Sequence, residues 1–190
     1  MDNNELLGTW DYRSLPPNIH IGNGCFLEYR GSFRNFKSQQ DPGLIIGDRV
    51  RAFTLTTFGV DPSGFVAVGD DTVLVGAIIM CAQSIKIGAR CVISYNVVIT
   101  DSDFHPIDIS LRCRDIEAVL PGGDPSQRQA VIKKPVNIGD DVWVGTGTII
   151  LKGVSVGNGA QIAPGSVISR NVPPGALVEG NPAVIIGESI

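Results

Sequence analysis

Apolar residues recur every six positions in the C-terminal third of the chain. From Ile138 the hexads read IGDDVW, VGTGTI, ILKGVS, VGNGAQ, IAPGSV and ISRNVP. The first position is isoleucine or valine in all six, and the fifth is always small or β-branched. This period fits neither an amphipathic helix, with its 3.6-residue spacing, nor the alternation by two of an antiparallel β-sandwich. It is typical of a solenoid of short strands and corners.

The same period continues upstream with interruptions. Clear hexads begin at Ile87, Ile93 and Ile99, with Cys91 and Val97 in fifth positions. Earlier starts are Val68, Leu74 and Met80, and then, more weakly, Ile46, Ala52, Phe58, Ile21, Leu27 and Phe33. Three hexads make one coil, which predicts six triangular coils over 21–38, 46–63, 68–85, 87–104, 138–155 and 156–173.

We therefore predict an all-β parallel β-helix. The first residue of each hexad points inward, and so does the fifth, near a corner where only a small side chain fits. Gly139, Gly145, Gly157 and Asn158 are expected at corners because they tolerate unusual backbone angles. The expected organisation is a lead-in over 1–20, the β-helix over 21–180 with a loop over 100–137, and a tail over 181–190.

Composition narrows the class of protein. The 190 residues are 43% hydrophobic, carry a formal net charge of −4 and contain no basic block, so neither nucleic acid nor an anionic membrane is an expected partner. No stretch approaches the ~18 apolar residues of a membrane span, and the polar N-terminus does not look like a signal peptide. The four cysteines lack metal spacing. We expect no metal and a reducing, cytoplasmic compartment.

The longest interruption of the repeat, after Ile99, contains His105, one of only two histidines. His20, the other, precedes the first coil and is interpreted as an exposed edge residue. A long excursion from a compact repeat is usually functional or disordered, and we expect this one to dock on a neighbour. His105 is either a solvated loop residue or a general base oriented by a carboxylate or carbonyl. Its flanking acids are Asp101, Asp103 and Asp108.

The stretch SDFHP, the excursion, and then VWVG, VPPG and GNPA in this order resemble the hexapeptide-repeat acyltransferases. The similarity is to the maltose/galactoside and polysaccharide O-acetyltransferase branch and covers about residues 87–187. The resemblance implies a left-handed β-helix. It also implies acetyl-CoA as cosubstrate, a sugar or glycan-precursor acceptor, and a homotrimer with active sites between subunits.

The resemblance assigns roles residue by residue. His105 matches the catalytic histidine, and Trp143 a tryptophan beside the acetyl-CoA and acceptor site. Thr146 matches a position whose backbone N–H faces the thioester oxygen, and Gly145, just before it, is expected to contact the cofactor. The other matches are Ala163 along the pantetheine arm, the pair Ser169 and Arg170 near the CoA phosphates, and Asn96 in a turn near the acceptor.

The sequence also departs from the sugar acetyltransferases. Ala82 and Gln83 stand where an acidic pair that helps bind the sugar is expected, which argues against galactose or maltose as acceptor. The segment 112–134 is expected to shape the acceptor pocket. With two histidines, the three-histidine zinc site of the γ-class carbonic anhydrases is excluded.

Two other functions remain open. The first is N-acetylation of an amino sugar or sugar nucleotide, in which the amine needs less help from a base. The second is a non-catalytic β-helix scaffold, which would need neither acetyl-CoA nor His105 and Trp143 together. The sequence favours catalysis over a scaffold because His105, Trp143 and Arg170 all match the family's positions, and we expect O- rather than N-acetylation.

Overall fold

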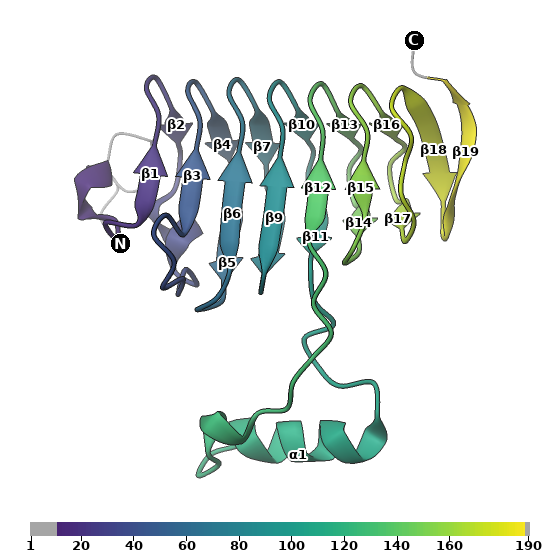
Figure 1. Cartoon of the computed structure of the whole chain (residues 1–190). Coiled ribbons are helices and arrows are strands. Elements are labelled where there is room, and N and C mark those ends of the chain that lie inside the picture. The colour runs from purple at the N-terminus through teal and green to yellow at the C-terminus, as the bar shows by residue number, and fades with distance from the viewer. Residues whose placement is uncertain (1–10, 189–190) are drawn as a thin grey trace.

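The computed structural model describes residues 11–188. The first ten residues of the expected lead-in and the last two of the expected tail lie outside the described residues. Within it, three sheets of mostly two- to four-residue strands run the length of the molecule (Figure 1). We call them sheets A, B and C in the order in which each coil visits them.

Sheet A consists of β1 (Ile19–Ile21), β3 (Leu44–Ile46), β6 (Phe65–Val68), β9 (Ser84–Ile87), β12 (Val136–Ile138) and β15 (Ser155–Val156). Sheet B consists of β2 (Phe26–Leu27), β4 (Arg51–Phe53), β7 (Val73–Val75), β10 (Val92–Ile93), β13 (Trp143–Val144), β16 (Gln161–Ile162), β18 (Ala176–Gly180) and β19 (Ala183–Glu188). Sheet C consists of β5 (Thr57–Val60), β8 (Ile78–Cys81), β11 (Val98–Thr100), β14 (Ile149–Ile150) and β17 (Val167–Ile168). Outside the sheets lie the 3₁₀-helices η2 (Tyr12–Ser14), η3 (Arg30–Phe33) and η4 (Pro125–Gln127) and the helix α1 (Ile109–Val119).

Each coil places one segment in every sheet and stacks in parallel on the coil before it. In the first coil, η3 occupies the place of the sheet C strand. The described residues form six such coils, followed by β18 and the antiparallel β19. The predicted parallel β-helix is confirmed. The segment expected as a tail contains strand β19, which closes the C-terminal end of sheet B.

The hexad register places the core as predicted. The first positions from Ile138 onward are at most 4% exposed, and the fifth positions at most 5%. In sheet C, in-register pairing stacks the five side chains Phe58, Ile79, Ile99, Ile150 and Ile168 into one buried column. Branched aliphatic side chains fill this narrow interior because they pack well on a pleated strand.

The predicted inward position of Met80 is wrong by one residue. Ile79 is fully buried and pairs with Phe58 and Ile99, whereas Met80 is only partly buried. The corner after Leu74 is one residue shorter than a regular hexad, and Gly76 makes it with a φ of 59°. A corner this tight favours glycine, because a Cβ is strained at positive φ.

The expected reason for the corner glycines also needs correction. Gly139, Gly145 and Gly157 do not adopt positive φ. They lie where adjacent coils approach closely, and a Cβ on Gly145 would come within 2.6 Å of the Pro164 nitrogen. Glycine is needed there because any side chain would clash with the corner of the adjacent coil.

The excursion after β11 is an ordered arm. Figure 1 shows it leaving the prism as a narrow neck and ending in α1, well away from the sheets. Asp108 caps the helix, its side chain accepting a hydrogen bond from the Leu111 N–H at 2.9 Å. The sequence analysis left the conformation of this arm open.

Candidate active site

His105 on the arm is held by a buried carboxylate. Its Nδ1 lies 2.9 Å from Oδ2 of Asp115 on α1. The Asp115 side chain is fully buried, whereas 56% of the His105 side chain is exposed. An ionised carboxylate only accepts hydrogen bonds, so Nδ1 carries the proton and Nε2 keeps its lone pair. This arrangement leaves the second ring nitrogen able to take a proton.

Asp115 is itself fixed by three donors besides the histidine. Arg128 donates from Nε to Oδ1 at 3.0 Å and from a terminal nitrogen to Oδ2 at 3.2 Å. The Gln129 backbone N–H donates to Oδ1 at 3.2 Å. The hydrogen bond from Arg128, followed by the one from His105, lowers the pKa of Asp115 well below its usual range. The carboxylate is therefore ionised wherever the histidine can act as a base.

The three acids that flank His105 in sequence form no hydrogen bond or ion pair with its ring within residues 11–188. Asp101 accepts hydrogen bonds of 2.6–2.7 Å from the backbone N–H groups of residues 82–84, including Ala82 and Gln83. Asp103 pairs with Lys152. Asp108 caps α1. Proximity in the sequence suggested these acids as partners of His105. The partner is instead Asp115, which lies within α1.

Five of the predicted residues lie along one edge of the prism. We call the corners between sheets B and C the B/C edge. Asn96, Trp143, Gly145, Thr146 and Ala163 lie on it or beside it. Trp143 points outward and is 40% exposed. Asn96 has a φ of 55°, and its N–H donates to Gly76, so its place is explained by the corner alone.

Two backbone groups on the B/C edge differ in what they can still bind. Among the described residues, no hydrogen bond uses the N–H of Thr146, while its carbonyl accepts from Gly165 at 2.8 Å. The N–H of Ala163 donates to the Val178 carbonyl at 2.9 Å. Thr146 can therefore offer a donor to a ligand. The Ala163 carbonyl already accepts from the Thr148 hydroxyl at 3.4 Å, so it can offer only its second lone pair.

The other predicted residues follow the edge between sheets C and A, which we call the C/A edge. The arm leaves the prism there, and Ser169 and Arg170 form the corner after β17. They line a cavity of about 250 Å³ together with Val184 and Ile185 of β19. Within the described residues, the Arg170 side chain forms no ion pair or hydrogen bond. An exposed cation beside an aliphatic wall suits a phosphorylated nucleoside.

One chain does not bring the two edges together. Sheet C separates the B/C edge from the C/A edge, and the arm points away from both (Figure 1). No hydrogen bond or ion pair among residues 11–188 joins His105 to Trp143 or Thr146. The predicted site residues therefore form two separate groups on each chain, which we call candidate half-sites.

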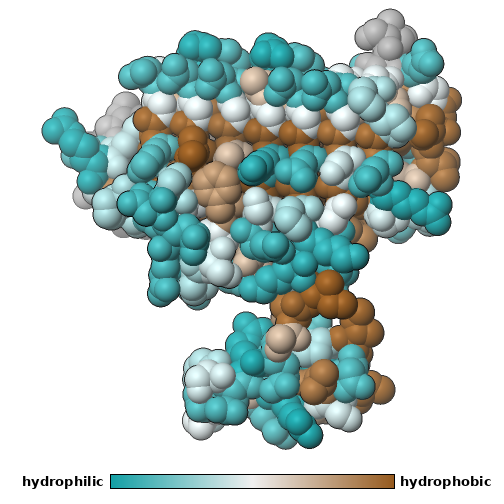
Figure 2. All heavy atoms as spheres, viewed as in Figure 1, coloured by the Kyte–Doolittle hydropathy of each residue, from teal (hydrophilic) through white to brown (hydrophobic). Residues whose placement is uncertain are grey.

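The arm carries apolar side chains that the chain itself does not cover. Figure 2 shows hydrophobic surface on the neck and on one side of the arm. Ile107 and Ile109 are 72% and 70% exposed. Ile109, Cys113 and Ile116 follow the i, i+4, i+7 spacing of one face of α1, and all three are exposed. A face of this kind is typical of an interface.

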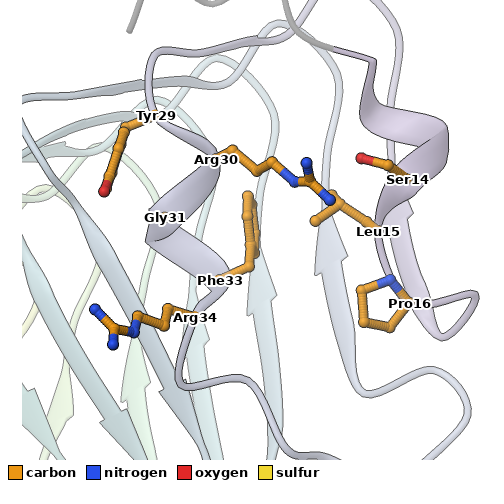
Figure 3. Close-up of a pocket in the computed structure, with 8 residues that line it drawn as sticks. All are labelled: Ser14, Leu15, Pro16, Tyr29, Arg30, Gly31, Phe33 and Arg34. Carbon is orange, nitrogen blue, oxygen red and sulfur yellow. The ribbon is translucent and has the colours of Figure 1, made fainter. Parts of the chain in front are cut away.

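Three cavities of about 210–270 Å³ lie around the neck and the adjoining prism, and His105 lines the smallest of them. A cavity of about 330 Å³ lies between η2 and η3 at the N-terminal end, lined by Leu15, Phe33 and Arg34 among others (Figure 3). It contains no predicted site residue. Between residues 11 and 188 there is no cluster of three or more potential metal ligands, and no helix in that range could span a membrane.

Comparison with known proteins agrees with the repeat and the fold. The family model of the bacterial transferase hexapeptide, with six repeats, matches residues 135–170. Nodulation protein L of Rhizobium meliloti (strain 1021) is 43% identical over 115 residues, which cover 55% of this chain and 60% of that protein. The match thus spans about 60% of the relative's length, which is less than two thirds.

Two solved structures share the fold. A hexapeptide-repeat acetyltransferase of Vibrio cholerae O1 biovar eltor, complexed with acetyl coenzyme A, superposes with a TM-score of 0.56 at 23% identity, covering 98% of this chain and 74% of the other. The N-acyltransferase AntD of Bacillus cereus, in complex with dTDP and coenzyme A, has a TM-score of 0.67 at 16% identity, covering 95% and 91%. By its repeat and its fold, the chain is a hexapeptide-repeat protein with the left-handed β-helix of the hexapeptide-repeat acetyltransferases.

Proposed function

We propose that the protein is an acetyl-CoA-dependent O-acetyltransferase that acts on a hydroxyl group of a sugar or glycan precursor. The observation that carries this proposal is the hydrogen bond between His105 and the buried carboxylate of Asp115. A hydroxyl group is a weak nucleophile and needs a base, and an oriented neutral histidine is the side chain best suited to that task near neutral pH.

The chain's own residues divide the work. Nε2 of His105 takes the proton of the acceptor hydroxyl as its oxygen attacks the thioester carbonyl. Asp115 stabilises the imidazolium that forms, and the free N–H of Thr146 stabilises the negative charge on the carbonyl oxygen. The histidine then returns the proton to the departing thiolate. Acetyl-CoA supplies the activated acetyl group.

The features at the C-terminal end fit acetyl-CoA. The cavity of Ser169 and Arg170 offers a hydroxyl and a free cation for phosphate, and Val184 and Ile185 offer an apolar wall for a base. Both neighbours described above hold coenzyme A or its acetyl ester, which supports the same ligand here. Trp143, Gly145 and Ala163 on the B/C edge would line the path toward the thioester.

We further propose that the active protein is a homotrimer with each site between two chains. The half-sites on the two edges can meet only if two copies meet. The apolar face of α1 provides a surface for that contact. His105 of one chain would then face Trp143 of the next.

The four cysteines, all free, fit the expected cytoplasmic location.

N-acetylation of an amino sugar or sugar nucleotide is the second candidate. It is favoured by the N-acyltransferase that shares the fold over 95% of the chain. The buried Asp115 favours O-acetylation instead, because an uncharged amine attacks a thioester with less help from a base.

An acceptor panel separates the two candidates. The full chain is supplied with acetyl-CoA and matched pairs of sugars and amino sugars, free and nucleotide-linked, and the release of free CoA is measured. We expect release that depends on an acceptor hydroxyl. Release with the amino sugar of each pair alone would establish N-acetylation. The absence of release, together with no heat of acetyl-CoA binding, would support a scaffold.

A further inference from the structure

We propose that the acceptor is a sugar unit carrying an acidic group, and that it binds in two adjoining cavities where the arm meets the prism. This inference rests on the proposed transfer reaction and names its substrate class. The cavities have volumes of about 220 and 270 Å³ and share Asp61 and Phe104 in their linings. Each is below the ~300 Å³ that small-molecule sites usually reach, so a ligand would span both.

The position of the cavities fits an acceptor. Their lining comes from sheet C strands that precede the arm and from the neck itself, including Thr57, Ile78 and Lys133. Arg170, proposed for the cofactor, lies beyond the arm at the other end of the prism. His105 is therefore approached by the thioester from the C-terminal side, which leaves the N-terminal side for the attacking hydroxyl.

Phe104 links the cavities to the histidine. It directly precedes His105, lines both cavities and has a φ of 59°. Positive φ is a real outlier for a bulky residue and persists only where the surroundings hold it. Arg128, which fixes Asp115, also donates to the Phe104 carbonyl at 3.1 Å. Phe104 thus contributes aromatic surface to both cavities, which is suited to pack against the apolar face of a sugar ring.

The charged side chains that line the two cavities would bind the polar groups of the sugar ring. Neither Lys37 nor Asp61 forms a side-chain ion pair or hydrogen bond within residues 11–188. Lys133 uses one donor on the Ala82 carbonyl at 3.3 Å, and two remain. Two ammonium groups with donors to spare select a carboxylate or phosphate, while Asp61 accepts from sugar hydroxyls. The missing acids at Ala82 and Gln83 agree with a site built for an anion.

Binding of three probes tests the site without requiring turnover. Glucose, glucuronic acid and glucose 6-phosphate are titrated into the full chain by ligand-observed NMR, and acetyl-CoA is titrated separately by calorimetry. We expect at least one of the two acids to bind about tenfold or more tightly than glucose, and the acid that binds identifies the anionic group. Lys37→Gln should remove that preference, while the exposed Lys86→Gln on sheet A should keep it.

Phe104→Gly provides a second variant that tolerates the positive φ. It should weaken all three sugars together and leave acetyl-CoA binding unchanged. Equal binding of glucose and both acids, or an unchanged preference in Lys37→Gln, would overturn the inference. If acetyl-CoA fails to bind while the acid preference is present, the proposed transfer reaction fails and the anion-selective sugar site stands.

Discussion

At the scale of single residues, the proposed chemistry depends on a carboxylate that is buried from water. Asp115 accepts from His105, Arg128 and the Gln129 backbone, and its side chain has no exposed surface. His105 could be predicted from the sequence because SDFHP is a local pattern. Asp115 could not, since its contact with the histidine exists only after α1 has folded back on the neck. The spacing of ten residues between them carries no local signal.

Asp115→Asn should reduce acetyl transfer by about 10²-fold or more, because an amide no longer fixes the histidine tautomer or stabilises its cation. As a positioning residue, Asp115 should affect kcat and the pH–rate profile while the KM for acetyl-CoA stays unchanged. Steady-state kinetics between pH 5 and 9 measure all three quantities. A variant that merely loses protein on purification, with a wild-type profile in the remainder, would contradict the assigned role.

The paired carboxylates predict the sign of the pH dependence of stability. Hydrogen bonds from Arg49, Arg128 and Arg90 lower the pKa of Asp71, Asp115 and Asp141, respectively. Groups with lowered pKa stabilise the fold above the unfolded value of about 3.9 and lose that contribution as the pH falls toward the folded value.

The free energy of unfolding should therefore decrease as the pH drops from 5 to 3, and the decrease should be smaller in Asp141→Asn. Urea titrations at several pH values measure it. Stability that rises over this range would contradict the assignment.

At the scale of elements, six residues per side of the triangle decide which side chains enter the core. The register from Ile138 onward follows from sequence because both inward positions of each hexad are restricted in size and shape. Met80 was misplaced because a shortened corner at Gly76 leaves no mark in the hydrophobic pattern. The corner glycines were recognised, but their close approach to the next coil depends on stacking.

Two adjacent isoleucines in β14 make a matched test of the register. Ile150 is fully buried in the sheet C column, and Ile149 points outward with 37% exposure. Ile150→Ala should lower the free energy of unfolding by about 2–5 kcal/mol through lost burial and a cavity. Ile149→Ala should cost less than about 1 kcal/mol. Chemical denaturation checks both, and similar losses would contradict the observed facing.

At the scale of the whole molecule, the prism divides the candidate site between two edges. The B/C edge carries Trp143 and Thr146, and the arm on the C/A edge carries His105. A partner chain that packed on the arm would cover the exposed apolar face of α1. The proposed assembly would give a role to an ordered arm that extends away from its own prism.

Ile116→Glu should dissociate the assembly and abolish transfer while leaving each chain folded, because it places a charge on the apolar face of α1 and glutamate is a good helix former. Arg114→Glu, on another face of the same helix, serves as the control and should remain a trimer. Analytical ultracentrifugation of both, with circular dichroism, decides the matter. A wild-type protein that sediments with the 20.1 kDa mass of one chain would contradict the shared site.

The measurement that tests the central claim most directly compares His105→Ala with the wild type. Acetyl-CoA and an acceptor from the panel are supplied to each, and initial rates of CoA release are followed at saturating acetyl-CoA. The hydrogen-bonded pair of His105 and Asp115 predicts a rate lower by about 10²–10⁴ in the variant, with acetyl-CoA binding retained. A variant that transfers acetyl groups to the hydroxyl acceptor at the wild-type rate would show that His105 is not the base.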